Sequence, residues 1–292
     1  MKNVCYFAPD TLEEALRLLA EYGPRMRVLA GGTDLVRDMN LKFNAPEAIL
    51  WIGKLGLEYI EECGEWIAIG TATRMKIAGS SALLKEKAGA LAHAAGKLAS
   101  PPVRSLATLG GNLCNASPGA DAGCALVGLE AQVVLTSITG QRTVPLDEFY
   151  LGPNRTVIQP QELLTEIRIK AMLDGEACAY AKIGRRQAMT LAVVNATSRL
   201  RLDGSGAVSS ASICVGAAAP TLLRIRPAEA LLIGQALTCE TIRAAAEIAS
   251  QEIKPIDDVH GTAWYRRKMA KVLVERTLRE AGKMDGGHIV HD

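Results

Sequence analysis

The stretch Val28-Leu29-Ala30-Gly31-Gly32-Thr33-Asp34-Leu35 carries the strongest indication of how this chain folds. An apolar run ends in two glycines, and Thr33 and Asp34 behind them favour the start of a helical turn. Glycine permits positive φ and lets the backbone approach a ligand closely. Successive backbone N–H groups in such a turn bind anions, so the stretch predicts a phosphate or pyrophosphate site. A plain tight turn capped by Thr33 or Asp34 is the alternative.

A second glycine pair occurs far along the chain and strengthens the phosphate interpretation. It lies in the run Thr108-Leu109-Gly110-Gly111-Asn112, again beside small hydroxyl and amide side chains. Neither pair matches a P-loop or the Gly-x-Gly-x-x-Gly fingerprint, so a different fold must bind the ligand. Two such anion nests together predict that the protein binds both phosphates of one dinucleotide.

The residues before and after the first glycine pair indicate alternating strands and helices. We expect a βαβ unit from a strand at 4–7, a helix with a capping box of Thr11 and Glu14 that Gly23 stops, and a strand at 27–30. Further strands are expected at 48–52 and 162–169, hairpins over 59–71 and 133–144, and helix over 76–100. Residues 101–121 are rich in Gly, Asn, Ser and Pro and are expected to be mostly loop.

The last third of the chain indicates a separate, smaller unit. Two alternating runs, 192–202 and 207–216, flank Asp203-Gly204-Ser205-Gly206 and predict a hairpin, with helices at 241–250 and 263–280. We therefore expect an α+β fold with a boundary near 174. Residues 1–174 form the larger domain, with lobes of about 1–55 and 56–174, residues 175–282 form the smaller one, and 283–292 form a flexible tail.

Composition excludes several classes of protein. The 292 residues carry a net charge of only +2, with both signs interspersed, which argues against nucleic acid or an anionic membrane as the main partner. No apolar run approaches the roughly 20 residues that cross a bilayer. The seven cysteines are scattered, with no Cys-x-x-Cys pair, and the start of the chain has no secretory pattern, so we expect a cytoplasmic protein without disulfides.

The two glycine segments, with Asn115-Ala116-Ser117-Pro118 and Asp121 behind the second, resemble the FAD-binding (medium) subunit of the molybdenum hydroxylases. That family includes the xanthine, carbon monoxide and nicotinate dehydrogenases. The resemblance runs from Ala8-Pro9-Asp10-Thr11 at the start to Tyr265-Arg266-Arg267 near the end. It implies a two-lobed FAD-binding domain of the vanillyl-alcohol-oxidase-like type, followed by a smaller α+β domain of sheet plus helices.

The resemblance also implies which residues bind FAD. Residues 28–35 wrap the pyrophosphate with backbone N–H groups, and the phosphate site is completed by Thr108, Gly110, Gly111 and Asn112. Asp121 matches an acidic position that hydrogen-bonds FAD; its alternative role is to cap a helix starting near Ala122. Lys182 matches a lysine beside the isoalloxazine, where a cation favours the reduced ring; its alternative is a solvated strand lysine.

Other positions are weaker or negative predictions. Tyr180 and Leu98 are candidates for packing on the ring system or for plain core. Thr190 stands where many relatives carry an acid, so a salt bridge from Arg185 or Arg186 to that position is not expected. Cys114 and Cys124 lie near the second segment, but without four-cysteine spacing we expect buried thiols and no metal site. No catalytic side chain is predicted.

The resemblance implies an oxidoreductase subunit that works in a hetero-oligomer. Substrate is oxidised on a large molybdopterin-binding chain, and electrons pass through a small chain with two [2Fe–2S] clusters into this FAD. The flavin then passes them to NAD or another acceptor. Two alternatives are a self-sufficient FAD-dependent oxidoreductase and an assembly subunit that has lost FAD.

Overall fold

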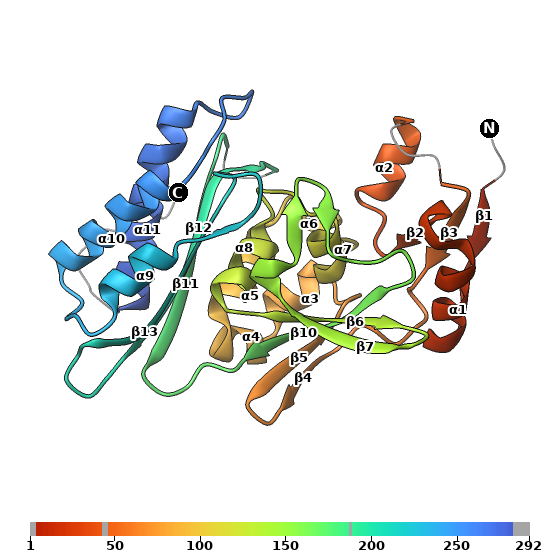
Figure 1. The fold of residues 1–292 in the computed structure, drawn as a ribbon, viewed down its shortest axis with the longest axis horizontal. Coiled ribbons are helices and arrows are strands. Elements are labelled where there is room, and N and C mark those ends of the chain that lie inside the picture. The colour runs from red at the N-terminus through yellow and green to blue at the C-terminus, as the bar shows by residue number, and fades with distance from the viewer. Residues whose placement is uncertain (1–3, 43–45, 187–188, 283–292) are drawn as a thin grey trace.

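The computed structural model describes residues 4–42, 46–186 and 189–282, and its elements form three side-by-side parts (Figure 1). The first part is a three-stranded parallel sheet in the order β1-β3-β2 with two helices. Its elements are β1 (Cys5–Phe7), α1 (Leu12–Tyr22), η1 (Gly23–Arg25), β2 (Met26–Leu29), α2 (Leu35–Asn40) and β3 (Ala48–Trp51). The predicted strand–helix–strand unit is present, but β3 lies between its two strands, so β1 and β2 do not pair.

The ends of α1 follow from a few side chains. The Thr11 hydroxyl accepts a hydrogen bond from the Glu14 N–H at 3.2 Å, which confirms the predicted N-cap. The Glu14 carboxylate accepts from the N–H of Asp10 at 3.4 Å rather than from that of Thr11, so the capping box is displaced by one residue. Gly23, with φ of 54°, ends the helix as predicted.

The second part is a five-stranded antiparallel sheet in the order β4-β5-β10-β6-β7, with helices above it in Figure 1. The predicted hairpins over 59–71 and 133–144 and the predicted strand at 162–169 are confirmed. The strands are β4 (Ile60–Cys63), β5 (Trp66–Gly70), β6 (Gln132–Ser137), β7 (Gly140–Pro145) and β10 (Leu163–Lys170). A short 3-10 turn η2 (Leu146–Glu148) and a small ribbon of β8 (Tyr150–Gly152) and β9 (Arg155–Thr156) precede β10.

The helices of this part correct one expectation. They are α3 (Met75–Ser80), α4 (Ala82–Lys87), α5 (Gly89–Lys97), α6 (Pro101–Arg104), α7 (Leu109–Cys114) and α8 (Asp121–Gly128). Residues 101–121, expected to be mostly loop, thus contain two short helices. Pro101 opens the first, where a missing N–H costs nothing. Thr108 caps the second, and its two glycines are compatible with helix because tertiary contacts fix the backbone there.

The third part is a four-stranded antiparallel sheet with helices on both faces. The sheet contains β11 (Glu176–Gly184), β12 (Ala192–Leu202), β13 (Val208–Gly216) and β14 (Leu223–Arg224), in that order. Helices α9 (Arg226–Leu232), α10 (Cys239–Glu252) and α11 (Ala263–Ala281) cover one face, and α5 and α8 contact the other (Figure 1). The predicted hairpin and its two following helices are confirmed. Because both faces are covered, β12 is buried from Ala192 to Leu200.

Each part has its own apolar core, and the second and third meet along β11 to β13. Tyr180 and Cys214 from the third sheet belong to the core of the second part. No helix in the described part of the chain is both long and apolar enough to cross a membrane. The predicted flexible tail, 283–292, lies outside the described residues.

Candidate cofactor site

The first glycine segment presents a row of backbone N–H groups that are not bonded to any described residue. Among the described residues, the N–H groups of residues 31–35 have no hydrogen-bond acceptor. Gly32 takes φ of 72°, and its carbonyl accepts from the Val36 N–H at 3.1 Å as α2 begins. The segment is half-buried, so these donors are partly shielded from bulk water. Such a row fits an anionic group such as a pyrophosphate.

Two glycines of the predicted site are required by close backbone contacts. A Cβ on Gly31 would lie 1.8 Å from the carbonyl oxygen of Leu106, so the first segment presses directly on the start of the second. A Cβ on Gly110 would lie 1.7 Å from Thr71 Oγ1. No other residue fits at either position without moving the backbone. The structure therefore brings residues 28–35 and 106–110 together, although they are far apart in sequence.

The second glycine segment differs from the anion nest expected of it. It forms the short helix α7, and the N–H groups at its start are already used inside the protein. Their acceptors are Thr73 O for Leu109 (2.9 Å), Thr71 O for Gly110 (2.9 Å), Thr108 Oγ1 for Gly111 (3.1 Å) and Thr108 O for Asn112 (3.0 Å). Among the described residues, the donors of this segment without an acceptor are the N–H and hydroxyl of Thr108 and the side-chain amide of Asn112. Asn112 Oδ1 accepts from the Gly123 N–H at 3.2 Å and ties α7 to the start of α8.

Asp121 and Lys182, predicted separately, form a buried ion pair. Lys182 Nζ lies 2.8 Å from Asp121 Oδ2, and the two side chains are 11% and 8% exposed. Asp121 is the first residue of α8, and its carboxylate makes no capping bond to the helix; Ala120 occupies the cap position. The interpretations of Asp121 as a helix cap and of Lys182 as a solvated lysine are therefore wrong.

Two further side chains complete the surroundings of this pair. The Tyr180 hydroxyl donates to Asp121 Oδ1 at 2.6 Å, and Asn195 Nδ2 lies 3.4 Å from the same oxygen. Burial, and then the nearby Asp121 carboxylate, raise the pKa of the Tyr180 phenol well above its ordinary value, so it stays a donor. Sequence reasoning missed Asn195, although an amide inside the apolar run of β12 was an available signal. Its buried Oδ1 has no partner among the described residues.

The lysine also reaches the last residue of α5, where the loop 98–100 begins, and the loop at Thr190. Lys182 Nζ lies 3.5 Å from the carbonyl oxygen of Lys97 and 3.4 Å from that of Thr190. The first of these loops is held further by Arg104, which donates to Leu98 O at 2.7 Å. Ala99 in the same loop takes φ of 41°, a conformation that costs free energy in a residue with a side chain and is commonest at functional sites.

Because position 190 is a threonine rather than an acid, Arg185 and Arg186 bond to other groups. The Thr190 hydroxyl accepts from the Arg185 N–H at 3.2 Å. The guanidinium of Arg185 donates to Val259 O at 2.9 Å, and that of Arg186 donates to Met189 O at 2.6 Å. Within the described residues, neither arginine pairs with a carboxylate.

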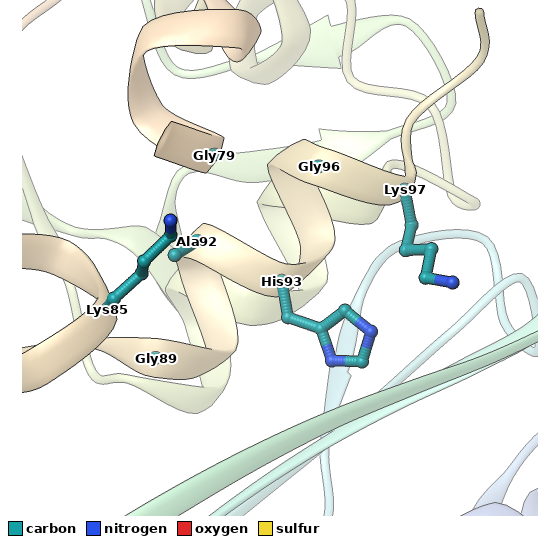
Figure 2. A pocket seen from close by; sticks show the side chains of 7 residues that line it. All are labelled: Gly79, Lys85, Gly89, Ala92, His93, Gly96 and Lys97. Carbon is teal, nitrogen blue, oxygen red and sulfur yellow. The ribbon is translucent and has the colours of Figure 1, made fainter. Parts of the chain in front are cut away.

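A surface hollow borders this site, because it is lined by Lys97, whose carbonyl Lys182 contacts, and by His93, whose ring packs edge-on against Tyr180. The hollow, of about 400 Å³, is lined by small residues of α3 and α5 with Lys85, His93 and Lys97 (Figure 2). None of the predicted site residues lines it. Cys124 is buried as expected, whereas Cys114 is solvent-accessible as a residue although the protein around it desolvates the thiol and raises its pKa to about 12. The described residues contain no cluster of three or more His, Cys, Asp or Glu side chains suited to a metal ion.

Comparison with known protein families identifies the chain. The family model described as "FAD binding domain in molybdopterin dehydrogenase" matches residues 2–170. The chain belongs to the FAD-binding subunits of the molybdenum hydroxylase family. A second model, "CO dehydrogenase flavoprotein C-terminal domain", matches residues 179–281 of this FAD subunit. The predicted family, cofactor and α+β architecture are thereby confirmed, and the FAD subunit is an oxidoreductase component.

Individual relatives agree over nearly their whole length. The FAD subunit is 35% identical to the carbon monoxide dehydrogenase medium chain of Hydrogenophaga pseudoflava, covering 94% of this chain and 96% of that protein. It is 34% identical to the 6-hydroxypseudooxynicotine dehydrogenase complex subunit alpha of Paenarthrobacter nicotinovorans, covering 94% and 93%. The solved structure of the Hydrogenophaga pseudoflava carbon monoxide dehydrogenase superposes with a TM-score of 0.92, at 36% identity and over 96% and 97% of the two chains.

Proposed function

We propose that this FAD subunit takes electrons from iron–sulfur clusters on a small partner chain and passes them to NAD or another acceptor. Substrate oxidation then belongs to a large molybdopterin-binding chain. FAD supplies the needed chemistry when bound, since it accepts electrons singly and releases them in pairs. The observation that carries the proposal is the row of unused N–H groups at residues 31–35, packed against the second glycine segment.

We assign the predicted residues to two ends of the cofactor. Residues 28–35 hold the pyrophosphate through the N–H groups of 31–35, and Gly31 and Gly110 allow the two segments to meet. Since the N–H groups of Leu109 to Asn112 are used internally, the Thr108 hydroxyl and the Asn112 amide are the donors that complete the phosphate site, while Gly111 leaves room for the Thr108 cap, because a Cβ there would lie 2.8 Å from Thr108 Oγ1.

At the other end of the site, the charged side chains of Asp121 and Lys182 adjust the reduction potential of the flavin ring. Lys182 supplies a cation beside the ring, which favours an added electron. Asp121, held by Tyr180 and Lys182, keeps lone pairs to accept from a cofactor hydroxyl. These side chains bind and orient the cofactor and adjust its potential.

The domain division expected from the sequence is part of the proposal. Three apolar cores, of which the second also includes Tyr180 and Cys214 from the third sheet, support a larger domain of residues 1–174 with lobes near 1–55 and 56–174, and a smaller domain of residues 175–282. The seven free cysteines support a reducing, cytoplasmic compartment.

The direct test is the visible spectrum of the purified full-length chain, followed by release and identification of the bound flavin. We expect a yellow protein with one FAD per chain, and co-purification of a molybdopterin chain and an iron–sulfur chain when the three are expressed together. Anaerobic bleaching by NADH would support NAD as the acceptor. A colourless chain that takes up no added FAD overturns the proposal. Turnover of an organic substrate by the isolated chain supports a self-sufficient flavoenzyme instead.

A further inference from the structure

Arg266, near the start of α11, is a buried arginine whose contacts lead toward the cofactor site. Its side chain is 7% exposed and donates through Nη2 to Asp258 Oδ1 at 2.6 Å. Through Nη1 it donates to the carbonyl oxygen of Ala217, also at 2.6 Å. Its Nε has no partner among the described residues. Burying a guanidinium that has one carboxylate partner and an unused donor costs free energy, so packing alone does not explain an arginine at this position.

The residue that Arg266 holds is in a strained conformation. Ala217 takes φ of 58°, in the left-handed region that residues with a Cβ rarely adopt. Such a conformation persists only where surrounding contacts enforce it. The Arg266 bond to its carbonyl is one of these contacts. The bond from the Lys254 N–H to the next carbonyl, that of Ala218, at 2.9 Å, is another.

The strained residue in turn holds the loop that leads into Asp121. The Ala217 N–H donates to the carbonyl oxygen of Pro118 at 2.6 Å. A Cβ on Gly119 would lie 3.5 Å from the Cβ of Ala217, so the two loops are in close contact. Pro118 stands three residues before Asp121, at the entry to α8. A continuous set of hydrogen bonds therefore runs from α11 through Ala217 to the segment that carries the Asp121–Lys182 pair.

We propose that Arg266 is a positioning residue for the flavin. By fixing Ala217, it sets the Pro118 loop and, through that loop, the place of Asp121 beside the cofactor. The inference deepens the proposed function and rests on it, since Asp121 is assigned to FAD. The physical reason for an arginine is geometric, because its planar fork reaches a carbonyl and a carboxylate at once and a lysine ammonium does not reproduce that fork.

The neighbouring residue is a matched control. Arg267 also donates to two backbone carbonyls, those of Ser250 at 3.1 Å and Ile253 at 2.9 Å. These lie at the end of α10 and reach the strained loop only indirectly, through the Lys254 N–H that follows Ile253. Arg266→Lys and Arg267→Lys therefore each disturb a guanidinium of the same helix that holds backbone carbonyls, but among the described residues only Arg266 bonds Ala217 directly and pairs with a carboxylate.

The experiment uses both variants of the full-length chain and two readouts. The first is the dissociation constant for FAD from flavin fluorescence. The second is amide hydrogen exchange without FAD at Ala217, Gly119 and Ala120. We expect Arg266→Lys to weaken FAD binding about tenfold and to speed exchange at Ala217, while Arg267→Lys changes FAD binding less than about twofold. Asp258→Asn, a second variant, shifts both readouts in the direction of Arg266→Lys.

The outcomes separate this inference from the proposed function. Equal loss of FAD affinity in the two lysine variants, or unchanged affinity in Arg266→Lys, overturns the positioning role. If the wild-type chain binds no FAD, the proposed function fails and so does the flavin part of the inference. The exchange rates then still show whether Arg266 holds Ala217 and the Pro118 loop.

Discussion

Lys182 Nζ and Asp121 Oδ2 lie 2.8 Å apart and join β11 to α8 across 61 residues of sequence. Both side chains are about nine-tenths buried. Taking two charges out of water costs free energy that their attraction only partly returns, so the pair is weak evidence of stabilisation by itself. Removing one member is expected to cost much more free energy, because the remaining charge stays buried without its partner. The pair therefore links the second part to the third and places two opposite charges at the proposed cofactor site.

Asp121→Asn is expected to destabilise the fold by about 3 kcal/mol, because it leaves the Lys182 ammonium buried beside a neutral amide. Urea unfolding of the apo protein measures the change. Asp147→Asn is the control, since Asp147 pairs with Arg226, which is 65% exposed, and should cost less than about 1 kcal/mol. The double variant Asp121→Asn/Lys182→Met should cost less than the sum of the two single variants. Additive losses would show that the two side chains do not interact.

Charge at the same pair is expected to set the potential of bound FAD. Lys182→Met removes a cation and should lower the reduction potential, whereas Asp121→Asn removes an anion and should raise it. About 30 mV corresponds to 1.4 kcal/mol for a two-electron couple, and we expect shifts of that order in each direction. Anaerobic titration against a reference dye measures them. Shifts of the same sign in both variants would contradict an electrostatic role.

Gly31→Ala is expected to abolish FAD binding, because its Cβ would lie 1.8 Å from the carbonyl oxygen of Leu106 and must push the two segments apart. The N–H row at 31–35 would then lose its geometry. Gly204→Ala is the control, since nothing lies within 4 Å of its added Cβ and its backbone is ordinary. Flavin content after reconstitution distinguishes the two variants. Normal FAD content in Gly31→Ala would place the pyrophosphate elsewhere.

Local patterns predicted much of this fold. The Thr11 cap and Gly23 stop, the turns at Gly64 and Gly140 and the hairpin around Gly204 depend on neighbours in sequence, and all are present. Short-range signals failed over 101–121. There Pro101 and Thr108 started helices while the glycines suggested loop, and contacts with Thr71 and Thr73 decided the outcome.

Only part of the site could be predicted, because local patterns do not show which groups meet in the fold. Glycine pairs are visible in sequence, but the partners of their N–H groups are not. In the described part of the chain, the N–H groups of the first pair have no acceptor, and those of the second are bonded to Thr71 and Thr108. The pairing of Asp121 with Lys182 and the contacts of Arg266 depend on long-range packing within and between the second and third parts, which no local pattern specifies.

Glu162 is expected to govern part of the acid stability of the larger domain. It accepts a two-pronged pair from Arg142, with Nε to Oε1 at 2.7 Å and Nη2 to Oε2 at 2.8 Å, and also accepts from the Gln159 N–H at 2.8 Å. The hydrogen bonds from Arg142, ahead of that from Gln159, hold the pKa of Glu162 below its ordinary value of 4.5, against the opposing effect of burial.

A carboxylate with a lowered pKa in the folded state stabilises the fold above the unfolded pKa, and that stabilisation is lost as pH falls below about 4.5. Glu162→Gln should therefore cost about 1 kcal/mol at pH 7, a modest value because Arg142 is 43% exposed. Below pH 4.5 its unfolding free energy should fall less steeply than that of the wild type, so the two curves converge.

Urea unfolding across the acid range measures both curves. Glu65→Gln is the control, since Glu65 is 65% exposed in its pair with Lys170, and its curve should follow the wild type. A Glu162→Gln curve that stays parallel to the wild type below pH 4.5 would mean that this carboxylate titrates no differently in the folded and unfolded chains.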